Sequence, residues 1–128
     1  MILRPAVDED SYYFLHLRND RDSVLMSHRP ALSLKEHVEW WATTTDERWV
    51  AEHEGERVGT LRVSSAGELS LVVAPEQRGK GHGVEMLRMA GYVKGRHARL
   101  IAEALPENTR SQRAFLKAGW TPLLFQWP

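Results

Sequence analysis

Three short segments in the middle of the sequence alternate apolar and polar residues, and they constrain the fold more than any other feature. They span residues 49–53, 57–63 and 68–73, and the residues between them, 54–56 and 65–67, have the composition of hairpin turns. Alternation over so few residues is typical of half-buried strands. We therefore predict an antiparallel meander at the centre of the fold.

Helices and further strands are expected on both sides of this meander. Residues 2–6 are short, apolar and interrupted by Pro5, which favours an edge strand. Ser33 and Glu36 stand at the positions of a capping box, which predicts the start of a helix. The remaining expected elements are helices over 8–20, 34–43, 84–94 and 108–117, the last ended by Gly119, and strands over 98–105 and 120–126.

This element order, β-α-α-β-β-β-α-β-α-β, predicts the α+β class with a mixed, mostly antiparallel central sheet. The chain has 128 residues, and compact domains mostly run about 100–150 residues, so we predict a single domain over 1–128. The C-terminal end after Gly119 is short, and we treat Leu123 and Phe125 as potential edge residues through which a homodimer could form.

Composition excludes several classes of protein. The 17 Lys and Arg residues balance the 17 Asp and Glu residues, whereas a general binder of nucleic acid or membrane surfaces needs a basic excess. No apolar run approaches the ~20 residues that span a bilayer, and the start does not resemble a signal peptide, so we expect a cytoplasmic protein. The chain has no Cys, and its six His show no paired ligand spacing, so no metal site is expected.

A glycine-rich segment follows the third strand of the meander. It contains Arg78-Gly79-Lys80-Gly81-His82-Gly83, placed between a strand and a helix. Such a turn gathers backbone N–H groups at a helix N-terminus, where they favour an anion such as a phosphate. The residues alone leave a plain flexible turn equally open. A Walker loop is excluded because no Gly-Lys-Ser/Thr closes the segment.

Two motifs together resemble the GNAT superfamily of acyl-CoA-dependent N-acetyltransferases. The run 78–83 is similar to the family's Arg/Gln-x-x-Gly-x-Gly/Ala pyrophosphate loop, and Val73-Ala74-Pro75-Glu76 precedes it as in the family. Downstream, Pro106-Glu107-Asn108, Ser111 and the run 117–120 resemble the second motif. The resemblance covers essentially the whole chain.

The resemblance implies acetyl-CoA as co-substrate. In this family the strands corresponding to residues 69–73 and 100–104 splay apart, and the pantetheine arm pairs with the exposed backbone as an additional strand. Asn108 is expected either to cap its helix only or also to reach that arm. The expected cofactor-binding residues are Val72, Val73, Arg78, Gly79, Lys80, Gly81, His82, Gly83, Asn108 and Ser111.

Acetyl transfer to an alkyl ammonium needs a base, because the ammonium pKa is about 10.4. Glu103 is the first choice, since related enzymes carry a functional glutamate at that place, with an exposed strand carboxylate as the alternative interpretation, and Glu68 is the second choice. His37 and His53 are weaker options. The absence of Cys favours direct attack in a ternary complex over an acyl-cysteine intermediate.

The resemblance also implies a tyrosine as general acid, seven residues after Asn108, but this sequence has Phe115 there. Another donor, such as Ser111 or Tyr92, or solvent must then protonate the thiolate. Alternatively, the chain is a non-catalytic acyl-CoA-binding module.

The N-terminal half is expected to bind the acceptor amine. Leu17-Arg18-Asn19-Asp20 and the later Ser-x-x-Glu-His-x-x-Trp pattern of residues 33–40 resemble GNAT enzymes that acetylate nucleotide-linked amino sugars, and also enzymes that acetylate protein N-termini. A small free amine is a further alternative. Tryptophans here could equally be packing residues. The expected acceptor-binding residues are Arg18, His37, Trp41 and Trp49.

Overall fold

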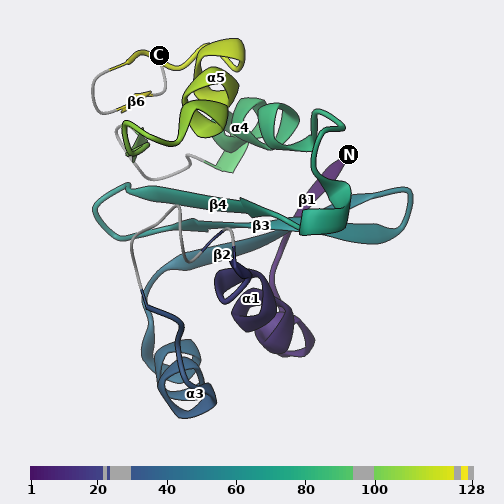
Figure 1. Ribbon diagram of the computed structural model, residues 1–128. Helices are drawn as coiled ribbons and strands as arrows, with labels where there is room; N and C mark the ends of the chain where they lie inside the picture. Colours follow the sequence, from purple (N-terminus) through teal and green to yellow (C-terminus); the bar gives the residue numbers. More distant parts are fainter. Residues whose placement is uncertain (22, 24–29, 94–99, 123–124, 127–128) are drawn as a thin grey trace.

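The computed structural model describes residues 1–21, 23, 30–93, 100–122 and 125–126, and Figure 1 shows their arrangement. The strands are β1 (Ile2–Pro5), β2 (Glu47–His53), β3 (Glu56–Val63), β4 (Leu69–Val73), β5 (Ile101–Ala102) and β6 (Phe125–Gln126). The helices are α1 (Ser11–Arg18), α3 (Leu34–Thr43), α4 (His82–Val93) and α5 (Thr109–Lys117), with short 3₁₀ turns at Asp8–Asp10 and Pro75–Gln77.

The predicted meander is confirmed. In the described part of the chain, β1, β2, β3 and β4 form an antiparallel sheet in that spatial order. β1 is an edge strand, as Pro5 requires, and Pro5 lies opposite Trp49 of β2. A register shift between Ala51 and Glu52 interrupts the β2–β3 pairing. The α+β class and the order of strands and helices agree with the expectation from the sequence.

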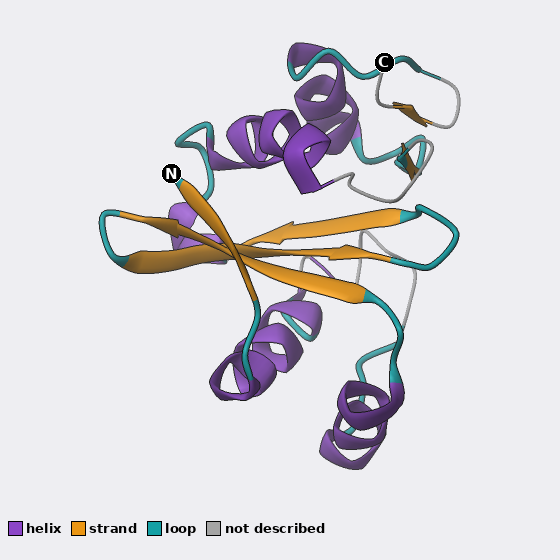
Figure 2. Cartoon of the chain, turned by 180° about the vertical axis from the view of Figure 1, so that it is seen from behind, coloured by secondary structure: helices purple, strands orange, loops and turns teal. Residues whose placement is uncertain are grey.

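Helices cover the two faces of this sheet in two separate groups. Helices α1 and α3 lie on one face, and α4 and α5 lie on the other together with β5 and β6 (Figures 1 and 2). The larger apolar core fills the α4/α5 side, where Leu61, Met86 and Leu87 are almost completely buried. Gly59 permits the close approach of α4, because a Cβ there would lie only 3.1 Å from Met86 Sδ.

Strands β4 and β5 meet only at one end in the described residues. Glu68 and Ile101 form a single parallel bridge, and the N–H of Ile101 donates to the carbonyl of Gly67 (2.9 Å). Beyond that bridge β5 pairs with β6 instead, through Ile101–Gln126 and Ala102–Phe125. The two strands therefore diverge, which is the splay expected for residues 69–73 and 100–104.

The last two strands are shorter than predicted. At the end of α5, Gly119 adopts a φ of +90° and the N–H of Trp120 donates to the carbonyl of Phe115 (3.0 Å). This helix ending directs Trp120 into the core, so residues 120–122 do not form a strand. Phe125 also differs from its expected role as an exposed edge residue: it is buried because its ring stacks on Phe115 at 4.8 Å. Leu123 lies outside the described residues.

Helix boundaries follow the predicted caps. The side chain of Ser33 accepts from the N–H of Glu36 and the Glu36 carboxylate accepts from the N–H of Ser33 (both 3.1 Å). Asn108 caps α5 by accepting from the N–H of Ser111 (3.2 Å). Within the described residues, no helix is long and apolar enough to cross a membrane.

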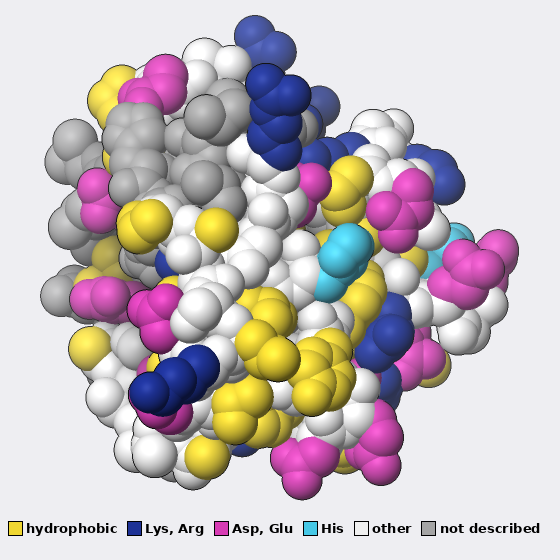
Figure 3. Space-filling model, turned by 60° about the horizontal axis from the view of Figure 1, so that its bottom comes forward, with side chains coloured by type: hydrophobic (Ala, Val, Ile, Leu, Met, Phe, Trp, Pro, Cys, Tyr) yellow, Lys and Arg dark blue, Asp and Glu magenta, His cyan; other side chains and the backbone are white. Residues whose placement is uncertain are grey.

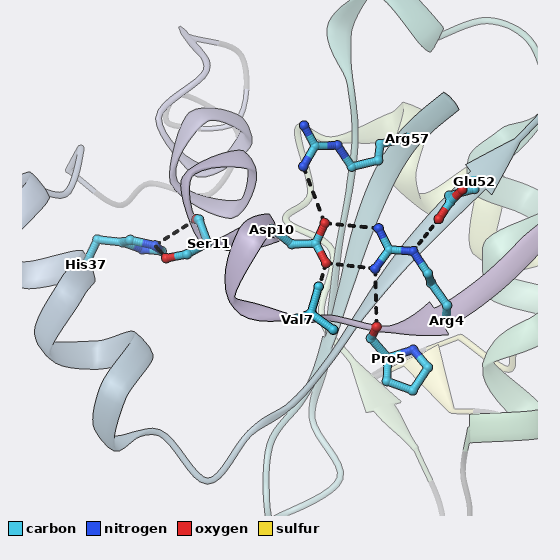
Figure 4. A network of polar contacts seen from close by, with 8 residues as sticks. All are labelled: Arg4, Pro5, Val7, Asp10, Ser11, His37, Glu52 and Arg57. Atoms are coloured by element: carbon cyan, nitrogen blue, oxygen red, sulfur yellow. Dashed lines mark hydrogen bonds and ion pairs between the residues drawn. The ribbon is translucent and has the colours of Figure 1, made fainter. Parts of the chain in front are cut away.

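A buried carboxylate fastens the N-terminal segment to the sheet (Figure 4). Asp10 accepts two hydrogen bonds from the Arg4 guanidinium (2.7 and 3.0 Å), and Arg57 lies 3.3 Å from it. Arg4 also bonds Glu52 of β2. The Arg4 guanidinium holds the pKa of Asp10 below its usual range. The acidic start predicted for the first helix is therefore also an anchor between β1, α1 and β3.

Candidate active site

Along the outer edge of β4, backbone N–H and C=O groups have no partner strand among the described residues beyond the bridge at Glu68. At its two ends, the carbonyl of Glu68 accepts from the N–H of Ser64, and the N–H of Ala74 donates to the carbonyl of Val58 (both 2.9 Å). The β3–β4 register is regular between these points. Because hydrogen bonds alternate along an antiparallel strand, Val72 pairs toward β3, whereas Leu71 and Val73 direct their N–H and C=O groups to the outer edge.

The glycine-rich loop continues from this edge. Gly79 and Gly81 have φ values of +77° and +82°, the left-handed region that favours glycine, and no atom lies within 4 Å of where their Cβ atoms would be. Within the described residues, the N–H groups of residues 79–84 have no protein acceptor. They converge at the N-terminus of α4, so the loop is a cradle suited to an anion.

The two cations of the loop differ in what they contact. The Arg78 guanidinium donates to the carbonyl of Val73 (3.2 Å) and to the carboxylate of Asp20 (3.0 Å), so it braces the loop against β4 and the segment after α1. Lys80 is exposed, and its Nζ contacts Gln77 Oε1 at 3.3 Å. Lys80 is therefore the cation available at the surface of the loop.

The ring of His82 lies at a cavity, next to His53. It is buried and lies 5.0 Å from that of His53, at a polar cavity of about 390 Å³ that is lined by Lys80 and by three glutamates, Glu54, Glu56 and Glu85. Burial, with smaller effects from His53 and Lys80, lowers the pKa of His82. His82 can offer a bound anion its backbone N–H, while the acidic cavity is unsuited to a pyrophosphate.

The first turn of α4 packs directly on β4. A Cβ on Gly83 would lie 3.4 Å from the Val73 side chain, so the helix and the strand end are in contact there. Asn108 and Ser111 lie at the start of α5, where they bond each other.

A second feature lies on the opposite, α1/α3 face of the sheet. It is a cavity of about 160 Å³, and Val72 places one of its walls on β4. Figure 3 brings this side of the molecule forward and shows hydrophobic side chains gathered there among charged ones. The cavity is lined by Phe14, Arg18, Leu32, His37, Trp40, Thr60, Arg62, Ser70 and Val72.

The charged side chains that line this cavity are cationic. Arg62 lies 5.3 Å from the centre of the Trp40 ring, 3.4 Å from Ser70 Oγ and 3.6 Å from the carboxylate of Asp46. Arg18 comes from the end of α1. A guanidinium beside an aromatic ring suits a ligand that combines an apolar or ring face with an anionic group. The site thus joins an open strand edge, an anion cradle and a ring-sized cavity.

Comparison with known proteins identifies this arrangement. The family described as acetyltransferase (GNAT) domain matches residues 1–121. The chain belongs to this family. No curated protein matches the sequence.

Solved structures, among them those of other acetyltransferases, share the fold. Aminoglycoside acetyltransferase AAC(6')-Ib in complex with coenzyme A is 18% identical, with a TM-score of 0.80 over 97% of this chain and 91% of that one. Spermidine N-acetyltransferase from Vibrio cholerae in complex with CoA and spermine is 15% identical, with a TM-score of 0.80 over 95% and 81%. A domain from Methanocaldococcus jannaschii is 18% identical, with a TM-score of 0.83 over 98% and 96%.

The GNAT domain places the four expected acceptor residues in different surroundings. Arg18 and His37 line the cavity. Trp41 instead packs α3 onto its neighbours: its Nε1–H donates to Asp8 (3.1 Å), and the Arg48 guanidinium lies 4.1 Å from its ring centre. Trp49 packs against the core cluster on the α4/α5 face, and its buried Nε1 has no hydrogen-bond partner in the described part of the chain.

The two expected carboxylates are both exposed and lie outside the cavity lining. Glu68 stands at the bridge between β4 and β5, and Glu103 directly follows β5. Among the described residues, no group of three or more His, Asp or Glu side chains is arranged to hold a metal ion. Phe115 is buried in the core, with its ring 5.1 Å from that of Trp120. The side chain of Tyr92 lies outside the described part of the structure.

The structure changes parts of the list of site residues expected from the sequence. Leu71 offers open backbone where Val72 was expected, and the alternation of an antiparallel ladder could have indicated this once one pair was fixed. Trp40 and Arg62 line the cavity instead of Trp41 and Trp49. Arg62 and Ser70 lie opposite each other on β3 and β4, so their shared face followed from the meander register.

Proposed function

We propose that this GNAT domain, as a single domain over residues 1–128, binds acetyl-CoA along the outer edge of β4. The observation that carries the proposal is that this one strand has its open edge beside the glycine loop and its Val72 side chain in the cavity. The pyrophosphate would lie on the N–H groups of residues 79–84, near Lys80. The pantetheine amides would pair with Leu71 and Val73, next to Asn108 and Ser111.

The proposed reaction is direct acetyl transfer to a primary amine in the cavity. The amine nitrogen attacks the thioester carbon, a C–N bond forms, the C–S bond breaks, and CoA leaves as a thiolate. The outward N–H of Val73 is placed to stabilise the carbonyl oxygen as it gains negative charge. Glu103 and Glu68 would receive protons only through water, because both lie outside the cavity. Since Phe115 has no acidic proton, Ser111 or solvent would protonate the thiolate.

The cavity supports an amino sugar linked to a phosphate or nucleotide as the acceptor. A cavity of about 150 Å³ holds one benzene molecule, so this cavity accommodates about one six-membered ring. Trp40 offers an aromatic face for such a ring, and Arg18 and Arg62 offer cations for phosphate oxygens. The similar structures contain kanamycin and spermine, which are polycations, whereas none of the described residues that line this cavity is acidic.

A second function has one specific observation in its favour. Phe115 stands where the family's acid is expected and is held in the core by Phe125 and Trp120. A domain that binds acyl-CoA without turning it over would tolerate this change. CoA thiol is a fair leaving group, so the loss of the acid need not abolish turnover. A cytoplasmic location and a homodimer stay predictions from the sequence.

The test combines acetyl-CoA calorimetry with thiol release measured by Ellman's reagent. The amines are UDP-glucosamine, glucosamine 1-phosphate, glucosamine, a peptide with a free N-terminus, spermidine and kanamycin. We expect acetyl-CoA binding and thiol release that is fastest with the phosphorylated sugars. Tight binding with no thiol release for any amine would support the binding module. Preference for spermidine or kanamycin would contradict the proposed acceptor, and preference for the peptide would favour protein N-termini.

A further inference from the structure

His37 is a buried titratable group inside the acceptor cavity. It lies on α3, its side chain is 2% exposed, and it lines the cavity together with Ser70 and Val72 of β4. Its Nε2 lies 2.9 Å from the backbone carbonyl of Ser11 and 3.0 Å from the Ser11 hydroxyl (Figure 4). The ring is therefore held from one side by the first residue of α1.

The contact with Ser11 fixes which ring nitrogen carries the proton. A carbonyl oxygen only accepts hydrogen bonds, so at 2.9 Å the Nε2 atom must be the donor. In the neutral ring, Nδ1 then has the lone pair and is the acceptor. In the described part of the chain Nδ1 has no hydrogen-bond partner. This is the tautomer that a base in the cavity needs.

The surroundings of the ring keep it neutral. Burial lowers the pKa of His37, while its bond to Ser11 acts in the opposite direction. Arg18 on α1 and Arg62 on β3 line the same cavity. Two carboxylates on neighbouring elements are engaged elsewhere, since Asp8 accepts from Trp41 Nε1 and Asp46 pairs with Arg62. The lone pair on Nδ1 is thus available near neutral pH.

We propose that Nδ1 of His37 is the general base that takes the proton from the acceptor ammonium in this cavity. The inference rests on the proposed acetyl transfer. One N–H bond of the ammonium breaks and its proton moves to Nδ1, leaving the nitrogen lone pair free to attack the thioester carbon. After the attack a second proton leaves the nitrogen. A proton is taken up by the CoA thiolate, which gives CoA-SH. His37 returns its proton to solvent, with the exposed Glu68 and Glu103 as acceptors through water.

The first experiment observes the ring itself. Long-range ¹H–¹⁵N spectra of the histidine-labelled protein, assigned with His37→Gln, report which nitrogen carries the proton. We expect the Nε2–H tautomer at pH 7, with Nδ1 unprotonated. A Nδ1–H tautomer, or a His37 ring protonated at pH 7, would overturn the proposal without any activity measurement.

The second experiment uses variants that separate the two nitrogens. His37→Gln keeps a donor near Ser11 but has no base, and His37→Asn places an amide near Nδ1 that cannot take a proton. With glucosamine 1-phosphate, we expect both to lower kcat about 100-fold with KM within threefold, since general bases contribute about 10²–10⁴-fold. His16→Gln, on the exposed side of α1, is the matched control and should leave kcat unchanged.

The pH profile and chemical rescue distinguish a base from a packing residue. In the wild type, kcat/KM should fall as pH drops through the lowered pKa of His37, because Nδ1 is then protonated, and His37→Gln should lose this inflection. Added imidazole should raise the activity of His37→Ala at least tenfold. If His37→Gln keeps the wild-type inflection, or if the inflection disappears in Glu103→Gln or Glu68→Gln instead, the proposal is wrong. Absence of thiol release from the wild type with every amine refutes the proposed function itself.

Discussion

The two faces of the four-stranded sheet are built in different ways. On the α4/α5 face, apolar residues such as Leu61, Met86 and Phe115 form a continuous core, and the anion cradle comes from the contiguous residues 78–83. On the α1/α3 face, the buried groups include Asp10 and His37, and the cavity lining ranges from Phe14 to Val72. One face thus combines an apolar core with the glycine loop, which is a local sequence motif. The other presents a cavity with aromatic and cationic side chains in its lining, assembled from distant segments.

In the proposed function, the two substrates lie on separate sides of β4. The backbone edge and the glycine loop suit a molecule with amides and phosphates, and the cationic cavity suits a small anionic amine. Substitutions on one side should therefore affect the binding of one substrate and spare the other.

The largest expected effect follows from Gly81→Glu. A side chain with a carboxylate would enter the cradle where the N–H groups converge, so acetyl-CoA affinity measured by calorimetry should fall at least 300-fold. Gly119→Glu is the matched control, because Gly119 has a similar φ (+90° against +82°) and equally open space. Both should lose similar unfolding free energy, about 1–2 kcal/mol from the left-handed backbone. Equal affinities in the two variants would contradict the location of the pyrophosphate.

Asp10→Asn should destabilise the polar face. It removes the charge that pairs with Arg4 and Arg57, so we expect the free energy of unfolding to fall by about 2 kcal/mol, less than for a fully buried pair because both arginines are partly exposed. The pKa of Asp10 is lowered in the fold, so its contribution is complete above its ordinary pKa and is lost as pH falls through the lowered value. Urea unfolding from pH 2 to 7 tests this, and an unchanged acid dependence in Asp10→Asn would refute it.

Arg62→Met should change acceptor selectivity. The variant keeps an apolar side chain near Trp40 but removes the cation, so KM for glucosamine 1-phosphate should rise about 10–30-fold, the scale of one charge-assisted hydrogen bond. KM for glucosamine and the affinity for acetyl-CoA should stay within threefold. Arg88→Met, an exposed arginine of α4 that contacts the carbonyl of Lys117, is the control. Equal losses for both sugars would mean that Arg62 supports structure and not phosphate recognition.

The smallest expected effect is on stability in mild acid. Burial lowers the pKa values of His37 and His82, so the unfolded chain binds more protons than the fold, and stability should decline as pH falls below about 6.5. Thermal unfolding of His37→Gln and His82→Gln should show a shallower decline between pH 6.5 and 5 than the wild type. His16→Gln should show the same pH dependence of stability as the wild type. If His37→Gln and His82→Gln also show the wild-type dependence, these two rings do not cause the loss of stability in mild acid.

Features that depend on neighbouring residues in sequence were predictable. The hairpins, the Ser33 and Asn108 caps and the glycine loop all follow from local chemistry, and the structure contains each of them. The order of elements followed as well, because short turns leave few ways to connect them.

Features that depend on side-chain direction were harder to predict. Trp40 and Trp41 are adjacent on one helix, and only the docking of α3 determines that Trp40 reaches the cavity while Trp41 packs against Arg48. Trp49 was expected at the acceptor, but its place on β2 directs it to the core side. The ion pairs of Asp10 with Arg4 and Arg57 join residues up to 47 positions apart, so no local sequence pattern predicts them.

A crystal structure with bound CoA tests most directly whether the two sides of β4 serve different substrates. The account predicts pantetheine amides hydrogen-bonded to the backbone of Leu71 and Val73, the pyrophosphate on the N–H groups of residues 79–84, and the sulfur directed toward the cavity lined by Val72 and His37. CoA bound within the α1/α3 cavity, or a pyrophosphate in the acidic cavity beside His53 and His82, would contradict it.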